Sequence, residues 1–218
     1  MRIRWGIILI GILALFSWGC TTFKTIDLGY SPAKVLTPLP GSLKIAVIPF
    51  EDLTLNGQEN PNWVGQASLY GIKLYTPNSI SYLVTRGAKN EMAAYGYQLS
   101  TDEIYSIQIN RHDIRTLLKK LHYIQVDFLV GGTISHFFVQ QIGRYIAEVE
   151  IEAYLIRPPD GEIVWSKKIG HREIRVPFTP EDFSPESEHV LNNLLQKTLT
   201  ELFRNSDFRL HALRDQKK

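Results

Sequence analysis

The chain has 218 residues, with 24 lysines and arginines against 22 aspartates and glutamates and a formal net charge of +2. So small a basic excess gives no argument for nucleic-acid binding or for an acidic lipid surface. The single cysteine excludes an intramolecular disulfide framework, and the length suits one domain with a proper core, or at most two small ones.

The first twenty residues have the layout of a secretory signal. Arg2 and Arg4 are the only charged side chains before Cys20, and an apolar run from Trp5 to Phe16 follows them. A basic start before a short apolar core is typical of a signal peptide. The run is shorter than the roughly 20 apolar residues that span a bilayer, so a permanent transmembrane anchor is the weaker interpretation.

The end of this segment, Ser17-Trp18-Gly19-Cys20, resembles the lipobox of bacterial lipoproteins. Its last two residues fit the pattern, whereas the first two depart from the usual leucine and the usual small residue. The resemblance implies a lipoprotein signal peptide over 1–19 and lipid attachment at Cys20, through a thioether-linked diacylglycerol and an acylated amine. A buried, inert cysteine is the alternative, but no apolar core surrounds this junction. Removal of 1–19 leaves 22 basic and 22 acidic residues.

Residues 20–42 are predicted to be the lipidated cysteine and a flexible tether. Pro32, Pro38 and Pro40 interrupt any periodicity, and each biases the residue before it toward extended backbone. At ~3 Å per residue, a semi-extended linker of this length would hold a domain several nanometres from a bilayer.

Leu43 to Phe50 predicts a strand that is covered on both faces, because it is almost continuously apolar and rich in β-branched residues. Glu51 to Pro77 is predicted to be a long loop, of the kind that is functional or poorly ordered. Its aromatic residues, Trp63, Tyr70 and Tyr75, would either cover the edge of the core or form a partner surface.

Two helices are predicted in the next part of the chain. The first is capped by Asn78 and Ser79 and ends at Gly96, and the second covers His112 to His122. A short strand at 97–99 lies between them.

Three strands then follow in close succession, at 126–139, 144–156 and 162–175. Tight turns at 141–143 and 158–161 join them, so we expect an antiparallel meander. The middle strand alternates between apolar and acidic residues, which is the pattern of a half-exposed strand.

The last element is a helix that begins near Ser184-Pro185-Glu186 and carries a leucine-rich stripe, and a polar tail covers 206–218. The order β-α-β-α-β-β-β-α predicts the α+β class. We expect a single domain over 43–205 with a mixed β-sheet, a three-stranded antiparallel meander, and helices packed on the sheet.

Three stretches, 44–50, 126–134 and 156–166, resemble the motifs "vaVlPF", "aDyvltGtv" and "l.d..tGeivWs" of a bacterial lipoprotein group. The group includes YajG-like lipoproteins, the curli-secretion pore subunit, and lipoproteins with the fold of the TolB amino-terminal domain. The resemblance implies a TolB-like domain over 43–205 that binds or assembles partners in the periplasm, with no catalytic residues. The tight turn at 141–143 and the charged meander argue against a curli-like pore.

Candidate catalytic and ligand residues are few. None of the six histidines is paired at an i, i+4 spacing, so we predict no metal site and no cofactor. Gly131-Gly132-Thr133 lies inside a strand and lacks the end of a phosphate-binding loop, which indicates a bend or a close backbone approach instead. Asp127 is interpreted as a strand-start residue.

An acidic row on one strand face, Glu148, Glu150 and Glu152, needs a basic neighbour, since adjacent carboxylates repel one another. Lys167 and Lys168 on the following strand are predicted to supply it. The row is then either a solvated face or a partner surface.

The sequence therefore predicts a lipid-anchored, non-catalytic binding or assembly module at the outer membrane, facing the periplasm. Thr21 favours the outer membrane, by resemblance to Gram-negative lipoproteins, in which a non-acidic residue follows the cysteine. We expect an envelope protein partner or self-association, and no nucleic acid. The alternatives are an auxiliary subunit of an envelope transporter or a peptidoglycan-synthesis complex, and an envelope enzyme with a deep pocket.

Overall fold

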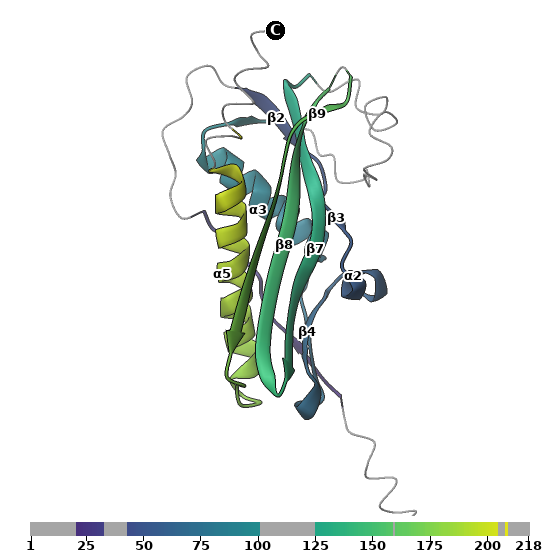
Figure 1. Ribbon diagram of the computed structural model, residues 1–218, viewed down its shortest axis with the longest axis vertical. Coiled ribbons are helices and arrows are strands. Elements are labelled where there is room, and N and C mark those ends of the chain that lie inside the picture. Colours follow the sequence, from purple (N-terminus) through teal and green to yellow (C-terminus); the bar gives the residue numbers. More distant parts are fainter. Residues whose placement is uncertain (1–20, 33–42, 101–124, 159, 205–207, 209–218) are drawn as a thin grey trace, which may run out of the picture.

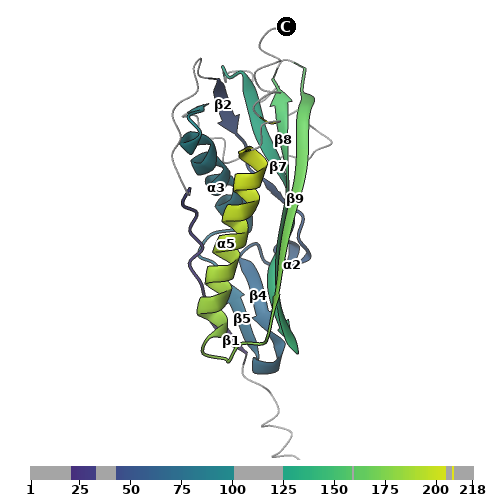
Figure 2. The ribbon, with the colours of Figure 1, turned by 60° about the vertical axis from the view of Figure 1, so that its left-hand side comes forward.

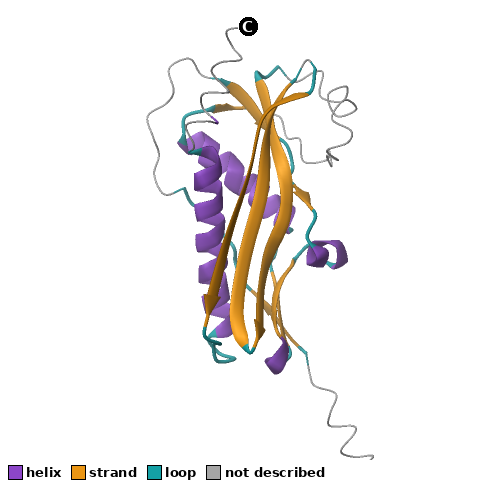
Figure 3. Ribbon diagram, viewed as in Figure 1, coloured by secondary structure: helices purple, strands orange, loops and turns teal. Residues whose placement is uncertain are grey.

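A mixed β-sheet of nine strands with helices against one face forms the body of the protein in a computed structural model, which describes residues 21–32, 43–100, 125–158, 160–204 and 208 (Figure 1). Helices lie between groups of strands along the chain, and the sheet mixes parallel and antiparallel pairs (Figure 3). The predicted α+β class is confirmed.

The meander is the longest part of the sheet. Strand β7 (Phe128–Ile142) pairs antiparallel with β8 (Arg144–Arg157), which pairs antiparallel with β9 (Glu162–Arg175). The predicted meander is thus confirmed. Gly143, with a φ of 70°, makes the first turn in the left-handed region that glycine adopts readily.

The other edge of β7 is shared by three shorter strands, which pair with it in parallel one after another along its length. Two of these three strands also pair with strands farther from β7: β2 pairs with β6, and β4 pairs with β5, which in turn pairs with β1. The strands on this side are β1 (Thr22–Thr25), β2 (Lys44–Val47), β3 (Glu51–Asp52), β4 (Trp63–Ala67), β5 (Ile72–Tyr75) and β6 (Gln98–Leu99).

Both long helices, α3 (Ile80–Ala94) and α5 (Phe183–Phe203), lie on the same face of the sheet (Figure 2). Ser79 caps α3, as predicted, and accepts a hydrogen bond from the Tyr82 amide. Beneath α5, alternate side chains of β8 enter the core: Tyr145, Ala147, Val149, Ile151, Ala153 and Leu155. The opposite side chains of β8 therefore point to the outer face of the sheet.

Strand β2 is covered on both faces, as predicted. Ile45 and Val47 belong to the main core, whereas Ala46 and Ile48 are equally buried on the other side of the strand. Near-continuous apolarity is what a strand in this position requires.

The prediction of a flexible tether is wrong for its first part. Thr22–Thr25 form β1, which pairs in parallel with β5, and Ile26 and Leu28 are buried in the core. The prolines that suggested a linker begin only at Pro32, after this strand has ended. Residues 33–42 lie outside the described part of the chain.

The prediction of a long loop over 51–77 is also wrong. This segment forms β3, the short helix α2 (Leu55–Glu59), β4, the 3-10 turn η1 (Ser68–Tyr70) and β5. Each of these elements has two to five residues, too few for a periodic pattern to appear.

The domain also extends beyond its predicted end at residue 205. Phe208 is fully buried, and its ring packs edge-on against Trp165 at 4.9 Å. The signal peptide over 1–19, Cys20, the predicted helix over 112–122 and the rest of the predicted tail lie outside the described residues. Within the residues that are described, no helix is long and apolar enough to cross a membrane.

Candidate partner-binding groove

The short helix α2 is fixed by side-chain hydrogen bonds at its start. Thr54 Oγ1 accepts from the Gly57 amide at 2.9 Å and donates to Asp52 Oδ1 at 2.6 Å. The Thr54 amide donates to the same Asp52 oxygen at 3.0 Å. A single helical turn has too few backbone bonds to be stable by itself, so this capping residue determines whether α2 forms.

Two further contacts place α2 against the body of the protein. A Cβ atom on Gly57 would lie 2.1 Å from Asp52 Oδ2, so glycine lets the helix approach that carboxylate without displacing its side chain. Asn56 Nδ2 donates to the Trp63 carbonyl at 2.6 Å, which joins α2 to β4. The dipeptide Asn56-Gly57 is therefore part of a helix.

The indole of Trp63 is held on three sides. Its Nε1 donates to the Gly65 carbonyl at 2.9 Å, and its ring meets Phe138 edge-on at 5.4 Å between centroids. The Lys73 ammonium lies 4.8 Å from the indole centroid. Aromatic pairing and a cation over the ring both favour this one orientation. Trp63 is thus a rigid apolar surface on the outer side of the sheet.

A groove of about 360 Å³ runs between α2 and the outer side of β7. Its apolar lining includes Leu53, Leu55, Trp63 and Phe138, and its polar lining includes Gln66 and His136. The Leu55 side chain is 83% exposed and that of Leu53 is 47% exposed. Large apolar side chains gathered at a concave surface are typical of a binding site.

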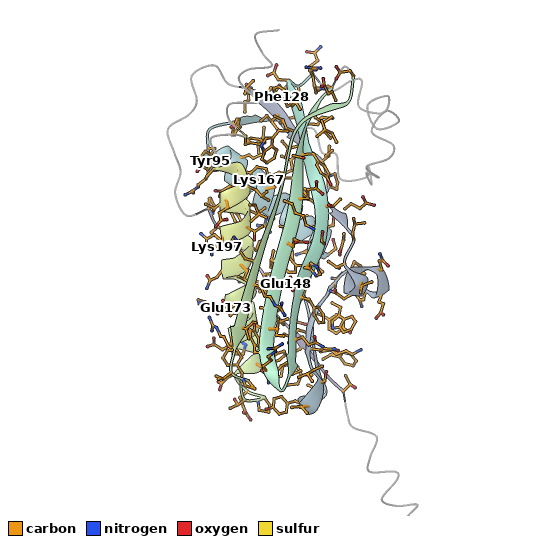
Figure 4. The ribbon with its side chains drawn as sticks, viewed as in Figure 1. Tyr95, Phe128, Glu148, Lys167, Glu173 and Lys197 are labelled. Carbon is orange, nitrogen blue, oxygen red and sulfur yellow. The ribbon has the colours of Figure 1, made fainter. Side chains whose placement is uncertain are left out.

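The acidic row of β8 lies beside this groove, on the outer face (Glu148 is labelled in Figure 4). Lys168 Nζ approaches Glu150 Oε1 at 2.6 Å from β9, and His136 Nε2 lies 4.0 Å from the same oxygen on the β7 side. The predicted pairing is confirmed for Lys168. It is wrong for Lys167, which lies opposite Ala153 and therefore on the helix-covered face.

The structural roles predicted for Gly131, Gly132 and Asp127 are confirmed. A Cβ on Gly132 would lie 2.0 Å from the Glu152 carbonyl oxygen, and one on Gly131 would lie 2.6 Å from Ile48. Both glycines therefore mark close approaches. Asp127 Oδ2 accepts from the Lys44 amide at 2.8 Å, at the start of β2.

The histidines are not brought together. His136 lies on β7, His171 on β9 and His189 on α5, while the other three lie outside the described residues. In the described part of the chain, no group of three or more histidine, cysteine, aspartate or glutamate side chains is placed to hold a metal ion. Cys20, the predicted lipid-attachment site, is likewise outside that part.

The groove itself was not predicted. The aromatic residues of 51–77 were expected either to cover the core edge or to form a partner surface, and Trp63 lines the groove from the edge of β4. One signal was available in the sequence. Thr54 is a strong N-cap residue three positions before Gly57, and this spacing predicts a helical turn. The contact of Trp63 with Phe138 joins residues 75 positions apart, so no local pattern contains it.

Fold and groove together define an α+β domain with an exposed apolar groove beside α2. No family model and no curated protein matches the sequence. Protein XCC0632 from Xanthomonas campestris, of family DUF330, has a similar structure, with a TM-score of 0.52, 12% identity, and coverage of 89% of this chain and 99% of that one. At that identity the similarity shows the fold alone.

Two other solved structures are more distant. Lipoprotein GNA1162 from Neisseria meningitidis has a TM-score of 0.40 and 19% identity, and the match covers 69% of this chain and 96% of that one. The PelC dodecamer from Paraburkholderia phytofirmans has a TM-score of 0.42 and 12% identity, over 75% of this chain and 90% of the PelC chain.

Proposed function

We propose that the protein is a lipid-anchored, non-catalytic module of the bacterial cell envelope that binds a protein partner in the groove beside α2. The observation that carries the proposal is Leu55, which is 83% exposed and stands next to the immobilised Trp63. Apolar side chains gathered at one concave surface, as Leu53, Leu55 and Trp63 are, gain free energy when a partner removes them from water. The lipobox-like sequence that ends at Cys20 supports the anchor.

The size and lining of the groove favour a protein segment as the ligand. Its volume of about 360 Å³ is at the low end of the roughly 300–1,000 Å³ of small-molecule sites. That space accommodates one or two apolar side chains, with Gln66 and His136 placed to meet the polar backbone of a partner. The neighbouring Glu150 and Lys168 add charges that can orient it.

The anchor is tested at Cys20. A Cys20→Ser variant should no longer incorporate an alkyne-labelled fatty acid and should accumulate as the longer precursor. Continued labelling of the variant would contradict lipid attachment at this residue. Fractionation of the wild-type protein should recover it with the outer membrane, with the domain accessible from the periplasm.

The groove is tested by photo-crosslinking in intact cells. A photoreactive amino acid at Leu55 should capture a partner, whereas the same amino acid at Lys197, an exposed position on α5, should not (Figure 4). Adding Trp63→Ala should remove the Leu55 adduct. Equal capture from both positions, or none from Leu55, would contradict the proposal.

The captured protein also separates the alternatives that the sequence left open. A transporter subunit or a peptidoglycan synthase would define the protein as an auxiliary subunit of that machinery. A second copy of this chain would define a self-assembling module.

A further inference from the structure

The chain enters the sheet almost immediately after Cys20. Thr22 is the first residue of β1, where its amide donates to the Gly71 carbonyl at 2.7 Å and it pairs with Ile72. Only Thr21 stands between Cys20 and this strand. The Cα atoms of residues 20 and 22 can therefore be at most about 7 Å apart. A lipid on Cys20, as the proposed function requires, would hold this end of the domain at the bilayer surface.

This same end exposes apolar side chains from three separate segments of the chain. Ala67 lies opposite Gln141, and Tyr145 lies opposite Arg175, so η1, the β7–β8 turn and the end of β9 are adjacent to one another (Figure 2). The exposed side chains, which we call the apolar tip, are Leu69 (70% exposed), Ile142 (56%) and Val176 (79%).

The apolar tip stands on a rigid base. Gln141 Nε2 donates to the Phe178 carbonyl at 3.0 Å, and the Phe178 amide donates back to Gln141 Oε1 at 2.8 Å. The Tyr70 hydroxyl donates to the same carbonyl at 3.4 Å, and the Phe178 ring packs on Tyr145 at 4.8 Å. The segment that follows Val176 is thus bonded to both β7 and η1, and the surface needs little ordering when it binds.

The charges around the tip are mixed. Arg144 is exposed on the β7–β8 turn, and Lys24 Nζ is engaged by the Pro180 carbonyl at 3.2 Å. Glu181 and Asp182 are exposed nearby. With both signs present, attraction to anionic lipid is weak, and apolar contact has to supply most of the interaction.

We propose that the apolar tip inserts into the headgroup region of the bilayer that holds the lipid of Cys20. An acyl anchor and an inserted apolar surface on one end of a rigid domain fix its orientation as well as its position. The long strands β7, β8 and β9 then stand upright on the membrane. Helix α2 lies part-way along the length of these strands (Figure 1). The partner-binding groove beside it is then held clear of the bilayer.

The experiment uses the lipidated protein in vesicles of phosphatidylethanolamine and phosphatidylglycerol. Lipidation blocks the thiol of Cys20, so one new cysteine at a time can be labelled with a nitrobenzoxadiazole fluorophore, in Leu69→Cys, Ile142→Cys and Val176→Cys. Leu55→Cys is the matched control, since it is an exposed leucine on α2. The three tip labels should emit at shorter wavelength than the control and be quenched by spin-labelled lipid but not by aqueous iodide.

The readouts keep this inference separate from the proposed function. Mass spectrometry of the N-terminal peptide first establishes whether Cys20 carries lipid, and its absence would overturn the anchor itself. With the lipid present, equal iodide quenching at the tip and at Leu55→Cys would overturn the insertion. Protection of the tip labels from iodide without quenching by spin-labelled lipid would show that protein covers the tip. That result would also overturn the proposed insertion into the bilayer.

Discussion

Arg204 donates from Nε to Glu91 Oε1 at 2.9 Å, joining the end of α5 to a carboxylate that is fully buried in α3. The Tyr30 hydroxyl donates to the other oxygen, and the Arg204 guanidinium stacks over Tyr95 at 5.2 Å. Burial raises the pKa of Tyr30 well above its usual value, and its bond to Glu91 adds to the shift. The segment after β1, helix α3 and helix α5 thus meet at a single buried charge.

Arg204→Met should destabilise the protein strongly, because it leaves the Glu91 carboxylate buried without its cation. Removing one partner of a buried ion pair costs about 3–5 kcal/mol of unfolding free energy. Urea denaturation followed by circular dichroism measures the loss. Arg172→Met, at an exposed arginine on β9, should change the free energy by less than about 0.5 kcal/mol. Similar losses in both variants would show that Glu91 does not depend on this pairing.

Tyr145 gives the protein an alkaline limit of stability. Burial raises the pKa of its hydroxyl to about 12, against the usual 10.0. A raised folded-state pKa means that the folded protein holds the proton more tightly than the unfolded chain does. The stability that the protonated Tyr145 hydroxyl contributes is therefore complete below pH 10 and is lost as the pH rises through 12. At pH 12 the unfolding free energy is lower by about 2 kcal/mol.

The measurement is the unfolding free energy of wild type and Tyr145→Phe between pH 9 and 12. The wild type should lose more stability over this range, while Tyr145→Phe keeps a smaller slope because the pKa values of Tyr30 and Tyr95 are also raised by burial. Tyr82→Phe, on the exposed side of α3, should show the same dependence of unfolding free energy on pH as the wild type. Parallel curves for wild type and Tyr145→Phe would contradict the assignment.

Gly132→Ala should destabilise the sheet at its centre. The added methyl group would lie 2.0 Å from the Glu152 carbonyl oxygen and 2.5 Å from the Phe50 ring, so the backbone of β8 has to move. Overpacking of this kind costs about 1–3 kcal/mol. Gly29→Ala is the control, because no atom beyond its two chain neighbours lies within 4 Å of its Cβ position. A thermal midpoint of Gly132→Ala equal to that of the control would refute the close approach.

The parts of the fold that the sequence predicts are those with long local patterns. Strand β8 alternates between buried and more exposed residues from Arg144 to Ala153, and β9 follows it through a turn, so their register needs little other information. Strands β1 and β3, with four and two residues, form by pairing with β5 and β7 far away in the sequence. No local pattern predicts a strand that exists because of a distant partner.

The same reason explains why the sequence does not predict the candidate groove. Cys20 is predicted from a contiguous motif, whereas the groove requires Leu55, Trp63 and Phe138 to meet through the parallel pairing of β4 with β7. The apolar tip similarly depends on three segments that only the sheet register brings together. Sequence patterns therefore predict the anchor, and tertiary pairing creates both surfaces proposed to act beside it.

Helix α2 provides the most direct test of the groove. Thr54→Ala removes the hydroxyl that caps the Gly57 amide, and loss of an N-cap costs about 1 kcal/mol of helix stability. The amides of Gly57 and Gln58, which bond to Thr54, should exchange hydrogen faster, while amides of β8 keep their protection. Crosslinking from Leu55 should weaken as the protection of the Gly57 and Gln58 amides is lost, because the position of Leu55 depends on α2. Thr54→Ser keeps the hydroxyl and should restore both readouts. If Thr54→Ala frays α2 but leaves the Leu55 adduct unchanged, the partner contacts Leu55 without needing the helix, and the groove is not its binding site.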